Sequence, residues 1–210
     1  MVFIEKIPLM SIRAVFFDFG GVILRTEYQS PRQQLAERFN MDYEEIDKVV
    51  FGTESARRAS LGEITEDAHW QEVMKRFKLP VSEVQSFSNA FFGGDVIDHE
   101  LVETINSLRG KFHIGLISNA WSGLRDFLKK EKLIDIFDTV VISAEVGVVK
   151  PEAKIFNIAL EQAKVQASEA VFIDDVAANI ESSEKVGMKG ILFIDSQETV
   201  RQLNQILKIK

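Results

Sequence analysis

The amino-acid sequence predicts an α/β protein whose core is one parallel β-sheet, with an all-helical unit inserted after the first strand. Two observations lead to this prediction. Short apolar and β-branched runs alternate with longer helical stretches over most of the chain, a pattern typical of strands joined by right-handed crossovers. Between Phe19 and His113, by contrast, helical periodicity continues with almost no β-branched runs, which favours a helical insertion.

The core strands are predicted from apolar runs that end in polar or turn-forming residues. The first run, Ala14–Phe17, leads into Asp18 and the pair Gly20-Gly21. Four consecutive apolar residues are typical of a strand that is buried on both faces. Similar runs recur later in the chain and predict further strands. These are expected at Ile114–Ser118, Thr139–Ser143, Ala170–Ile173 and Gly190–Phe193.

The inserted helices are predicted between the prolines and glycines that interrupt the helical periodicity. Ser82 and Gln85 match a capping box and predict a helix start at that point. The pair Gly93-Gly94 is expected to form either a hinge back to the core or a plain turn. The expected helices span Arg32–Phe39, Tyr43–Phe51, Glu66–Lys78 and Glu83–Phe92.

Composition limits the classes of partner. The chain of 210 residues has no cysteine, which excludes disulfides and thiolate metal sites. Its formal net charge of -7 speaks against nucleic-acid binding, which needs a basic surface. No apolar run reaches the roughly 20 residues of a membrane span, and Met1–Leu9 is expected to be a dispensable lead-in rather than a signal peptide. A small-molecule ligand and a cytoplasmic location are predicted, and the oligomeric state is left open.

Residues suited to phosphate chemistry follow four of the predicted strands in turn. Asp18 follows the first strand, Ser118-Asn119 the second, Lys150-Pro151 the third and Asp174-Asp175 the fourth. In open α/β sheets, ligands bind at the carboxyl ends of the strands. These side chains are therefore expected to meet at one edge of the sheet.

Three carboxylates at one site would repel one another. Asp18, Asp174 and Asp175 can lie together if Lys150 and a hard divalent cation neutralise them, because such cations prefer carboxylate oxygens as ligands. The sequence therefore predicts a Mg²⁺ site with Lys150 beside it.

Other conspicuous residues have simpler explanations. Trp70 and Trp121 are expected to be packing residues, and Arg57 and Arg58 to form a solvated helix face. Asn179 lies one helical turn beyond Asp174-Asp175. It fits a bond within its own helix as well as it fits a role in the site.

The stretches Ile117–Trp121, Val146–Glu152 and Phe172–Asn179, taken with Asp18, resemble the haloacid dehalogenase superfamily, subfamily IA with a helical C1 cap. The resemblance covers residues 12–207 and is closest to the phosphatase-like N-terminal domain of soluble epoxide hydrolases. It implies a Rossmann-like core with strand order 5-4-1-2-3. The implied core comprises residues 1–26 and 94–210, and the implied helical cap comprises residues 27–93.

The resemblance also implies roles for the matching residues. Asp18 would attack phosphorus and form an aspartyl-phosphate, while Lys150 and Ser118 would assist by holding the phosphoryl oxygens. The implied phosphate-binding residues are Phe19, Gly20, Ser118, Asn119 (through its amide) and Lys150.

The implied magnesium ligands are Asp18, Asp174 and the backbone carbonyl of Gly20. Asp175 would act either through a bound water or by orienting Lys150, and the sequence leaves both possibilities open. Because Gly20 binds metal through its backbone, metal binding is expected to tolerate the absence of a side chain there.

Gly20 departs from the family pattern, in which a second aspartate at this position protonates the leaving group and activates water. The favoured function is still a Mg²⁺-dependent phosphomonoester hydrolase for a small phosphorylated metabolite, such as a sugar phosphate. Candidate substitutes for the missing acid are Glu27, Tyr28 and His69.

Two alternatives remain. The first is a weakly active or non-catalytic regulatory protein that binds phosphate and metal. The second, less favoured, is a haloacid dehalogenase. Gly20 permits that reaction because halide leaves without a proton, but Asp174-Asp175 argues against it because halide displacement needs no cation.

Overall fold

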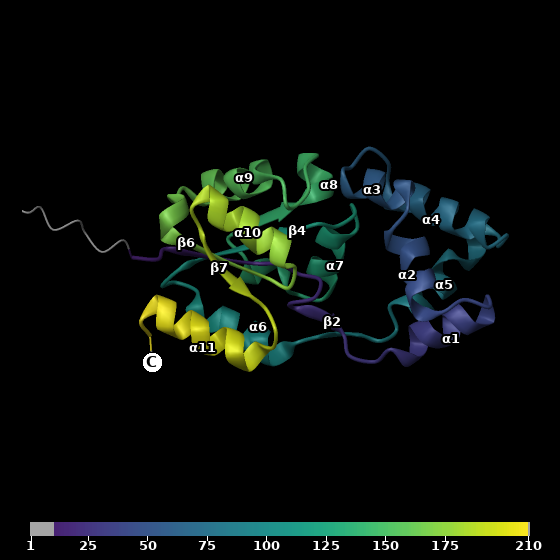
Figure 1. Ribbon diagram of the computed structural model, residues 1–210, viewed down its shortest axis with the longest axis horizontal. Coiled ribbons are helices and arrows are strands. Elements are labelled where there is room, and N and C mark those ends of the chain that lie inside the picture. The colour runs from purple at the N-terminus through teal and green to yellow at the C-terminus, as the bar shows by residue number, and fades with distance from the viewer. Residues whose placement is uncertain (1–10, 210) are drawn as a thin grey trace, which may run out of the picture.

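The computed structural model describes residues 11–209 and consists of a layered α/β core beside a helical bundle (Figure 1). The predicted lead-in, Met1–Leu9, lies outside the described residues. All five predicted core strands are confirmed to within one residue at each end. Four of them are mostly buried apolar runs, and the edge strand β7 has one buried residue, Ile191. They are β1 (Ala14–Phe17), β4 (His113–Ser118), β5 (Thr139–Ile142), β6 (Ala170–Asp174) and β7 (Lys189–Leu192).

The core sheet has the order β5-β4-β1-β6-β7, and each neighbouring pair is parallel. Numbered among themselves and read from the other edge, these strands follow the implied order 5-4-1-2-3. The labels differ because two additional strands, which the sequence did not predict, form a separate sheet. β1 is the central strand, and Phe17 pairs with Ile173 of β6, so Asp18 and Asp174 end adjacent strands.

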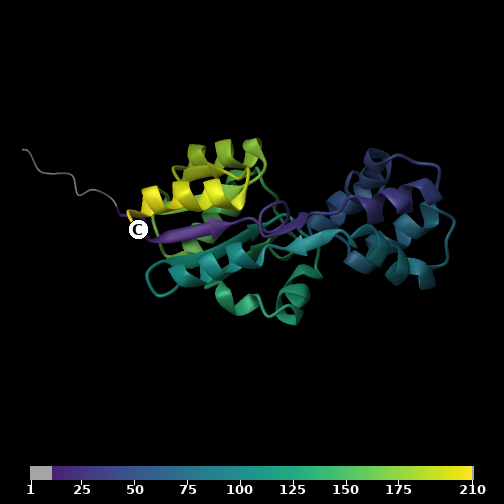
Figure 2. The ribbon, with the colours of Figure 1, turned by 90° about the horizontal axis from the view of Figure 1, so that it is seen from below.

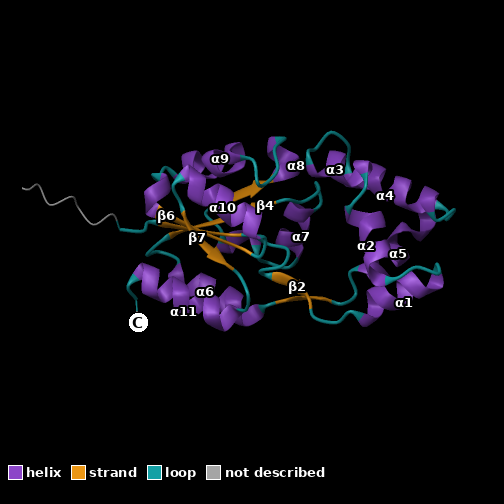
Figure 3. Cartoon of the chain, in the orientation of Figure 1, coloured by secondary structure: helices purple, strands orange, loops and turns teal. Residues whose placement is uncertain are grey.

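Helices cover both faces of the core sheet (Figure 3). Alternate side chains of β1 point to opposite faces. Val15 and Phe17 pack in one apolar cluster, while Ala14 and Phe16 pack in the other. The first cluster includes residues of α6 (His99–Leu108), α7 (Leu124–Lys130) and α11 (Ser196–Leu207), and the second those of α9 (Ala153–Ala163) and α10 (Ala177–Val186).

A two-stranded antiparallel sheet joins the core to the bundle. It pairs β2 (Leu24–Thr26) with β3 (Asp95–Ile97), so both connections between the two parts run side by side (Figure 2). The carbonyl of Gly94 accepts hydrogen bonds from the amides of Glu27 and Tyr28. A Cβ at Gly94 would lie 1.7 Å from the carbonyl oxygen of Tyr28. Glycine is therefore required there for the close approach of the two connections.

The bundle contains the four predicted helices and one that the sequence did not reveal. The unpredicted helix is α3 (Glu54–Ser60), whose sequence lacks an apolar periodicity. The predicted capping box at Ser82 and Gln85 is wrong, because Val81–Glu83 forms a 3-10 turn and α5 begins after it without a side-chain cap. The other helices are α1 (Ser30–Arg38), α2 (Tyr43–Phe51), α4 (Glu66–Arg76) and α5 (Val84–Phe91).

The bundle has an apolar cluster of its own, to which Leu35, Ile46, Val49, Met74 and Phe91 belong. A separate apolar core is what an independent domain requires. On this basis we propose residues 27–93 as a cap domain. Within residues 11–209, no helix is both long enough and apolar enough to cross a bilayer.

Candidate active site

Asp18, Ser118 and Asp174 come together because they terminate three neighbouring strands of the sheet. All three side chains are buried. The amide of Asp18 donates to the carbonyl of Ile173 at 2.8 Å, which ties the first residue after β1 to β6. The amide of Phe19, one of the predicted phosphate-binding groups, instead donates to Asp18 Oδ1 at 2.7 Å. The Asp18 carboxylate is thus oriented by its own turn.

Lys150 joins the site from the loop that follows β5. Its Nζ lies 2.7 Å from Asp18 Oδ1 and 2.6 Å from Asp174 Oδ2, and its side chain is only 1% exposed. A buried ammonium is stable only when it is paired. Lys150 therefore neutralises part of the charge of both carboxylates, as the sequence predicted.

The side chain of Asn119 holds the Lys150 loop in place. Its Oδ1 accepts a hydrogen bond from the amide of Lys150 at 2.7 Å, and its Nδ2 donates to the carbonyl of Lys150 at 2.9 Å. The implied contact of Asn119 with phosphate concerned its backbone amide, so the side-chain role is new. It links the ends of the second and third core strands at the site.

Asp174 is held by donors on both of its oxygens. Oδ1 accepts from the amide of Val176 at 2.8 Å and from Asn179 Nδ2 at 3.0 Å, while Oδ2 accepts from Lys150 and again from Asn179. A carboxylate has about four lone-pair sites, so these contacts nearly saturate Asp174. The two possibilities for Asn179 are thereby resolved: its side chain fixes Asp174.

Asp175 completes the acidic group, and its side chain is more exposed than those of its two partners. Asp18, Asp174 and Asp175 each offer one oxygen, and these oxygens lie within 4.8 Å of one another. The described contacts place Lys150 on Asp174 and Asp18, not on Asp175. Three hard oxygen donors with a single lysine fit a divalent cation such as Mg²⁺.

Gly21 makes room for Asp175. Gly21 has a φ of +82°, and a Cβ there would lie 2.2 Å from Asp175 Oδ2. Gly21→Ala is therefore expected to displace Asp175 and to weaken Mg²⁺ binding about 10–100-fold, as losses of metal-positioning contacts do. Isothermal titration with Mg²⁺ measures this effect.

Gly110→Ala is the matched control, because Gly110 has a φ of +79° and no atom within 4 Å of its Cβ position. Both variants should lose about 1 kcal/mol of stability from backbone strain. Equal Mg²⁺ affinities in the two variants would contradict the role given to Gly21.

Burial raises the pKa of Asp18 to about 6, with the repulsion of Asp174 adding to the increase and the attraction of Lys150 opposing it. The pKa in the folded protein thus exceeds that of the unfolded chain. Asp18 contributes stability that is complete below about pH 4 and is lost as the pH rises through about 6.

The affinity for Mg²⁺ should increase as Asp18 loses its proton. Because carboxylate ligands must lose their protons to bind metal, Mg²⁺ is expected to raise the melting temperature more one pH unit above the pKa of Asp18 than one unit below it. Differential scanning calorimetry with and without Mg²⁺ tests this expectation. An increase of equal size at both pH values would show that Asp18 does not titrate with metal binding.

Gly20 leaves an open position beside Asp18. A Cβ at Gly20 would meet no atom within 4 Å, and its φ is not in the left-handed region. None of the three predicted substitutes is poised as an acid at this position. Glu27 pairs with Arg25 at 3.0 Å, Tyr28 is 65% exposed in the connection to the bundle, and His69 is buried in the bundle with Nδ1 bonded to Ser55.

The site opens into a cavity of about 1000 Å³ between the core and the bundle. Gly20, Ser118 and Asn119 line its core side. Its bundle side carries residues of α2, α4 and α5. The cavity can therefore hold the part of a ligand that projects away from Asp18.

Glu66 of the bundle and Trp121 of the core make contacts between the two parts. Glu66, at the start of α4, accepts from the amide of Gly123 at 2.9 Å and from Trp70 Nε1 at 3.2 Å. Trp121, which belongs to the core, packs 4.4 Å from the ring of His69. Trp121 thus packs, as predicted, but it packs against the bundle and also lines the cavity. The sequence does not reveal this contact of Glu66 with the core, because Gly123 lies 57 residues further along the chain.

Curated relatives match this chain over most of its length. Rat bifunctional epoxide hydrolase 2 is 27% identical over 94% of the chain, which spans only 39% of that protein's length. D-ribitol-5-phosphate phosphatase of Bacteroides thetaiotaomicron is 26% identical over 85% of the chain and 90% of its own length.

A solved structure matches the fold. It is a haloacid dehalogenase family enzyme of Bacteroides thetaiotaomicron, in complex with magnesium and inorganic phosphate, and it aligns with a TM-score of 0.72 at 20% identity over 86% of this chain and 93% of its own. The family model for haloacid dehalogenase-like hydrolases matches residues 15–193. With the sheet order and the cluster of aspartates at its edge, this match shows that the chain belongs to the haloacid dehalogenase-like hydrolase family.

Proposed function

We propose that the protein is a Mg²⁺-dependent phosphomonoester hydrolase that acts on a small phosphorylated metabolite through an aspartyl-phosphate at Asp18. The observation that carries this proposal is the buried Asp18 carboxylate, paired with Lys150 at 2.7 Å and grouped with two more aspartates. The phosphatase name of one relative and the magnesium and phosphate bound to the structural relative support it. The cytoplasmic location stays a prediction.

The reaction has two displacements at phosphorus. First, an Asp18 oxygen forms a bond to phosphorus while the bond from phosphorus to the leaving oxygen breaks, and the electron pair departs with that oxygen. Water then attacks phosphorus and the bond to Asp18 breaks, which yields phosphate and the free carboxylate. Lys150, the Ser118 hydroxyl and the Asn119 amide stabilise the charge on the phosphoryl oxygens in both steps.

The donor set suggests which residues hold the metal. Asp18, the Gly20 carbonyl and Asp175 would bind Mg²⁺, and Asp174 would orient Lys150, because the oxygens of Asp174 already accept four hydrogen bonds. This assignment differs from the implied one, in which Asp174 was the direct ligand. When bound, Mg²⁺ supplies positive charge that offsets the carboxylates and the transferring phosphoryl group.

A weakly active or non-catalytic regulatory protein is the second candidate function. The open position at Gly20 favours it, since the predicted substitutes do not fill that position. A slow enzyme and a protein that only binds phosphate differ in whether phosphate is released, so a kinetic measurement distinguishes them. Haloacid dehalogenation explains neither the three grouped carboxylates nor their arrangement around Lys150.

Phosphate release from acetyl phosphate, phenyl phosphate and ribitol 5-phosphate, measured with and without Mg²⁺, tests the proposal. Magnesium-dependent release that falls at least about 10⁴-fold in Asp18→Asn is expected, since loss of a nucleophile removes the covalent route. Folded, Mg²⁺-binding protein that releases no more phosphate than Asp18→Asn from any of the three compounds would reject the hydrolase and favour the binding role.

A further inference from the structure

Aromatic side chains form one wall of the cavity. Phe51 and Trp70 come from the bundle, Phe92 from its return connection, and Trp121 from the core. We call these four residues the aromatic wall. The ring centroids of Phe51 and Trp121 are 5.7 Å apart, and those of Trp70 and Phe92 are 6.1 Å apart. Phe51 is 48% exposed, whereas Trp70 is 3% exposed, so Phe51 offers the most apolar surface of the four to a ligand in the cavity.

In the amino-acid sequence, one residue of the aromatic wall lies close to the proposed phosphoryl site. Trp121 follows Ser118 by three residues, and both line the cavity. A ligand whose phosphate contacts Ser118 can therefore reach this wall with its remaining part. Aromatic faces bind flat apolar groups better than polyols, because they remove apolar area from water and stack in offset or edge-on geometry.

The cavity offers little free positive charge. Its cationic side chains, within residues 11–209, are Arg25, Arg32 and Lys130. Lys130 is 81% exposed at the rim. The two arginines lie deeper, so their partners decide whether either could bind a second anionic group.

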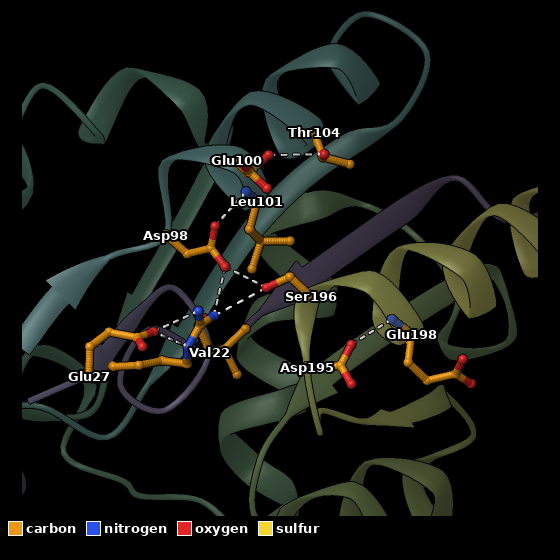
Figure 4. Close-up of polar contacts among 10 residues, drawn as sticks. Val22, Glu27, Asp98, Glu100, Leu101, Thr104, Asp195, Ser196 and Glu198 are labelled. Carbon is orange, nitrogen blue, oxygen red and sulfur yellow. Dashed lines mark hydrogen bonds and ion pairs between the residues drawn. The ribbon is translucent and has the colours of Figure 1, made fainter.

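Both arginines are already paired. Arg25 contacts Asp98 at 2.7 Å and Glu27 at 3.0 Å, and Figure 4 shows Glu27, Asp98 and Ser196 converging on one guanidinium group. Arg32 contacts Asp47 at 2.7 Å and Asp95 at 3.4 Å. The portion of the substrate beyond its phosphate is therefore expected to be uncharged.

Polar side chains of α5 also line the cavity, but they bond to one another. Gln85 Nε2 donates to Asn89 Oδ1 at 2.8 Å, and the Ser88 hydroxyl donates to the carbonyl of Gln85 at 3.2 Å. A polyol would have to compete with these bonds. The cavity therefore favours an apolar group over a sugar chain.

The absence of an acidic side chain at Gly20 also favours a substrate with an aromatic leaving group. Without a general acid beside Asp18, the leaving oxygen departs with its negative charge. Phenols ionise near pH 10, as the tyrosine side chain does, whereas alkanols are far weaker acids, similar to water. A phenolate thus leaves far more readily than an alkoxide.

We propose that the substrate is an aryl phosphate with an uncharged, apolar aromatic leaving group, whose ring packs on the aromatic wall. This inference rests on the proposed function, and it names the substrate class for the same site. The wall determines the binding preference, and Gly20 determines the chemical preference. The two observations are independent.

Kinetics of wild type and Phe51→Ala test the inference. Wild type should hydrolyse phenyl phosphate with a kcat/KM at least about 100-fold above that for ribitol 5-phosphate, given the missing acid. Phe51→Ala should lower the ratio of kcat/KM for phenyl phosphate to kcat/KM for acetyl phosphate by about tenfold, which is the effect of losing one aromatic contact. Val81→Ala, at an exposed bundle position outside the cavity, should leave this ratio unchanged.

Binding gives a second readout that needs no turnover. The only two tryptophans of the chain are Trp70 and Trp121, and both line the cavity. Phenylphosphonate should therefore quench tryptophan fluorescence of Asp18→Asn in Mg²⁺, with an affinity about tenfold above that of ethylphosphonate. Equal affinities, or a higher kcat/KM for ribitol 5-phosphate, would overturn the aryl assignment.

The two proposals fail in distinguishable ways. Magnesium-dependent hydrolysis of acetyl phosphate with no preference for phenyl over ribitol phosphate would leave the hydrolase standing and reject only the aryl inference. Absence of all hydrolysis would reject the hydrolase, and the phosphonate titration would then decide alone whether the wall binds aromatic groups.

Discussion

Replacement of Gly20 by aspartate is expected to raise kcat for ribitol 5-phosphate by about 10²–10⁴-fold, the usual contribution of a positioned general acid. The side chain has room, because a Cβ at Gly20 meets no atom within 4 Å and the residue lines the cavity next to Ser118. The gain should be smaller for phenyl phosphate and absent for acetyl phosphate, whose leaving groups need little or no protonation. Steady-state kinetics on the three compounds measures this gradient.

Gly20→Asn is the matched control for this gain, since asparagine has nearly the shape of aspartate but cannot donate a carboxyl proton. It should not accelerate any of the three reactions. A folded, Mg²⁺-binding Gly20→Asp protein that is no faster than Gly20→Asn on ribitol 5-phosphate would mean that another group already supplies the proton. The open position at Gly20 would then not limit turnover.

Replacement of Lys150 by methionine is expected to reduce both stability and activity. The substitution leaves Asp18 and Asp174 buried without the ammonium that lies within 2.7 Å of both. Loss of one partner of a buried ion pair costs about 3–5 kcal/mol of unfolding free energy. Phosphate release should also fall by at least about 10²–10³-fold, because a donor to the transferring phosphoryl group is lost.

Urea denaturation of the metal-free protein measures the first loss. Lys154→Met, at an exposed position of α9, controls for the chemical change and should stay within about 0.5 kcal/mol of wild type. Saturating Mg²⁺ should restore part of the stability of Lys150→Met, because the cation neutralises the same carboxylates. An unfolding free energy equal to that of Lys154→Met would show that Lys150 does not stabilise the buried pair.

The sequence predicted the core sheet well, because β1, β4 and β6 are short, mostly apolar runs that are buried on both faces. The site residues followed from the strand ends, since parallel strands place their carboxyl ends at one edge. Asp18, Ser118 and Asp174 are accordingly side by side. Helix α3 and the β2–β3 sheet were missed for a physical reason. The helix has no apolar stripe, and the two strands have three residues each and pair across a long separation in the chain.

The finer division of the site depends on contacts that no local pattern encodes. Asp174 and Asp175 are adjacent and identical in type, yet only Asp174 accepts from Lys150 and Asn179. Likewise, the need for glycine at Gly21 comes from the position of Asp175, which belongs to a different strand end. Such distinctions require the tertiary structure.

If Asp18 carries the phosphoryl group during turnover, as proposed above, the aspartyl-phosphate can be trapped chemically. Wild-type protein mixed with acetyl phosphate and Mg²⁺, quenched in acid and reduced with borohydride, would be digested and analysed by mass spectrometry. We expect Asp18 to be converted to homoserine only when both Mg²⁺ and acetyl phosphate are present. Both are needed to form the aspartyl-phosphate, and borohydride reduces that acyl phosphate but not the free carboxylate. Magnesium-dependent phosphate release with Asp18 unmodified, or with the modification at Asp174 or Asp175, would show that Asp18 is not the nucleophile.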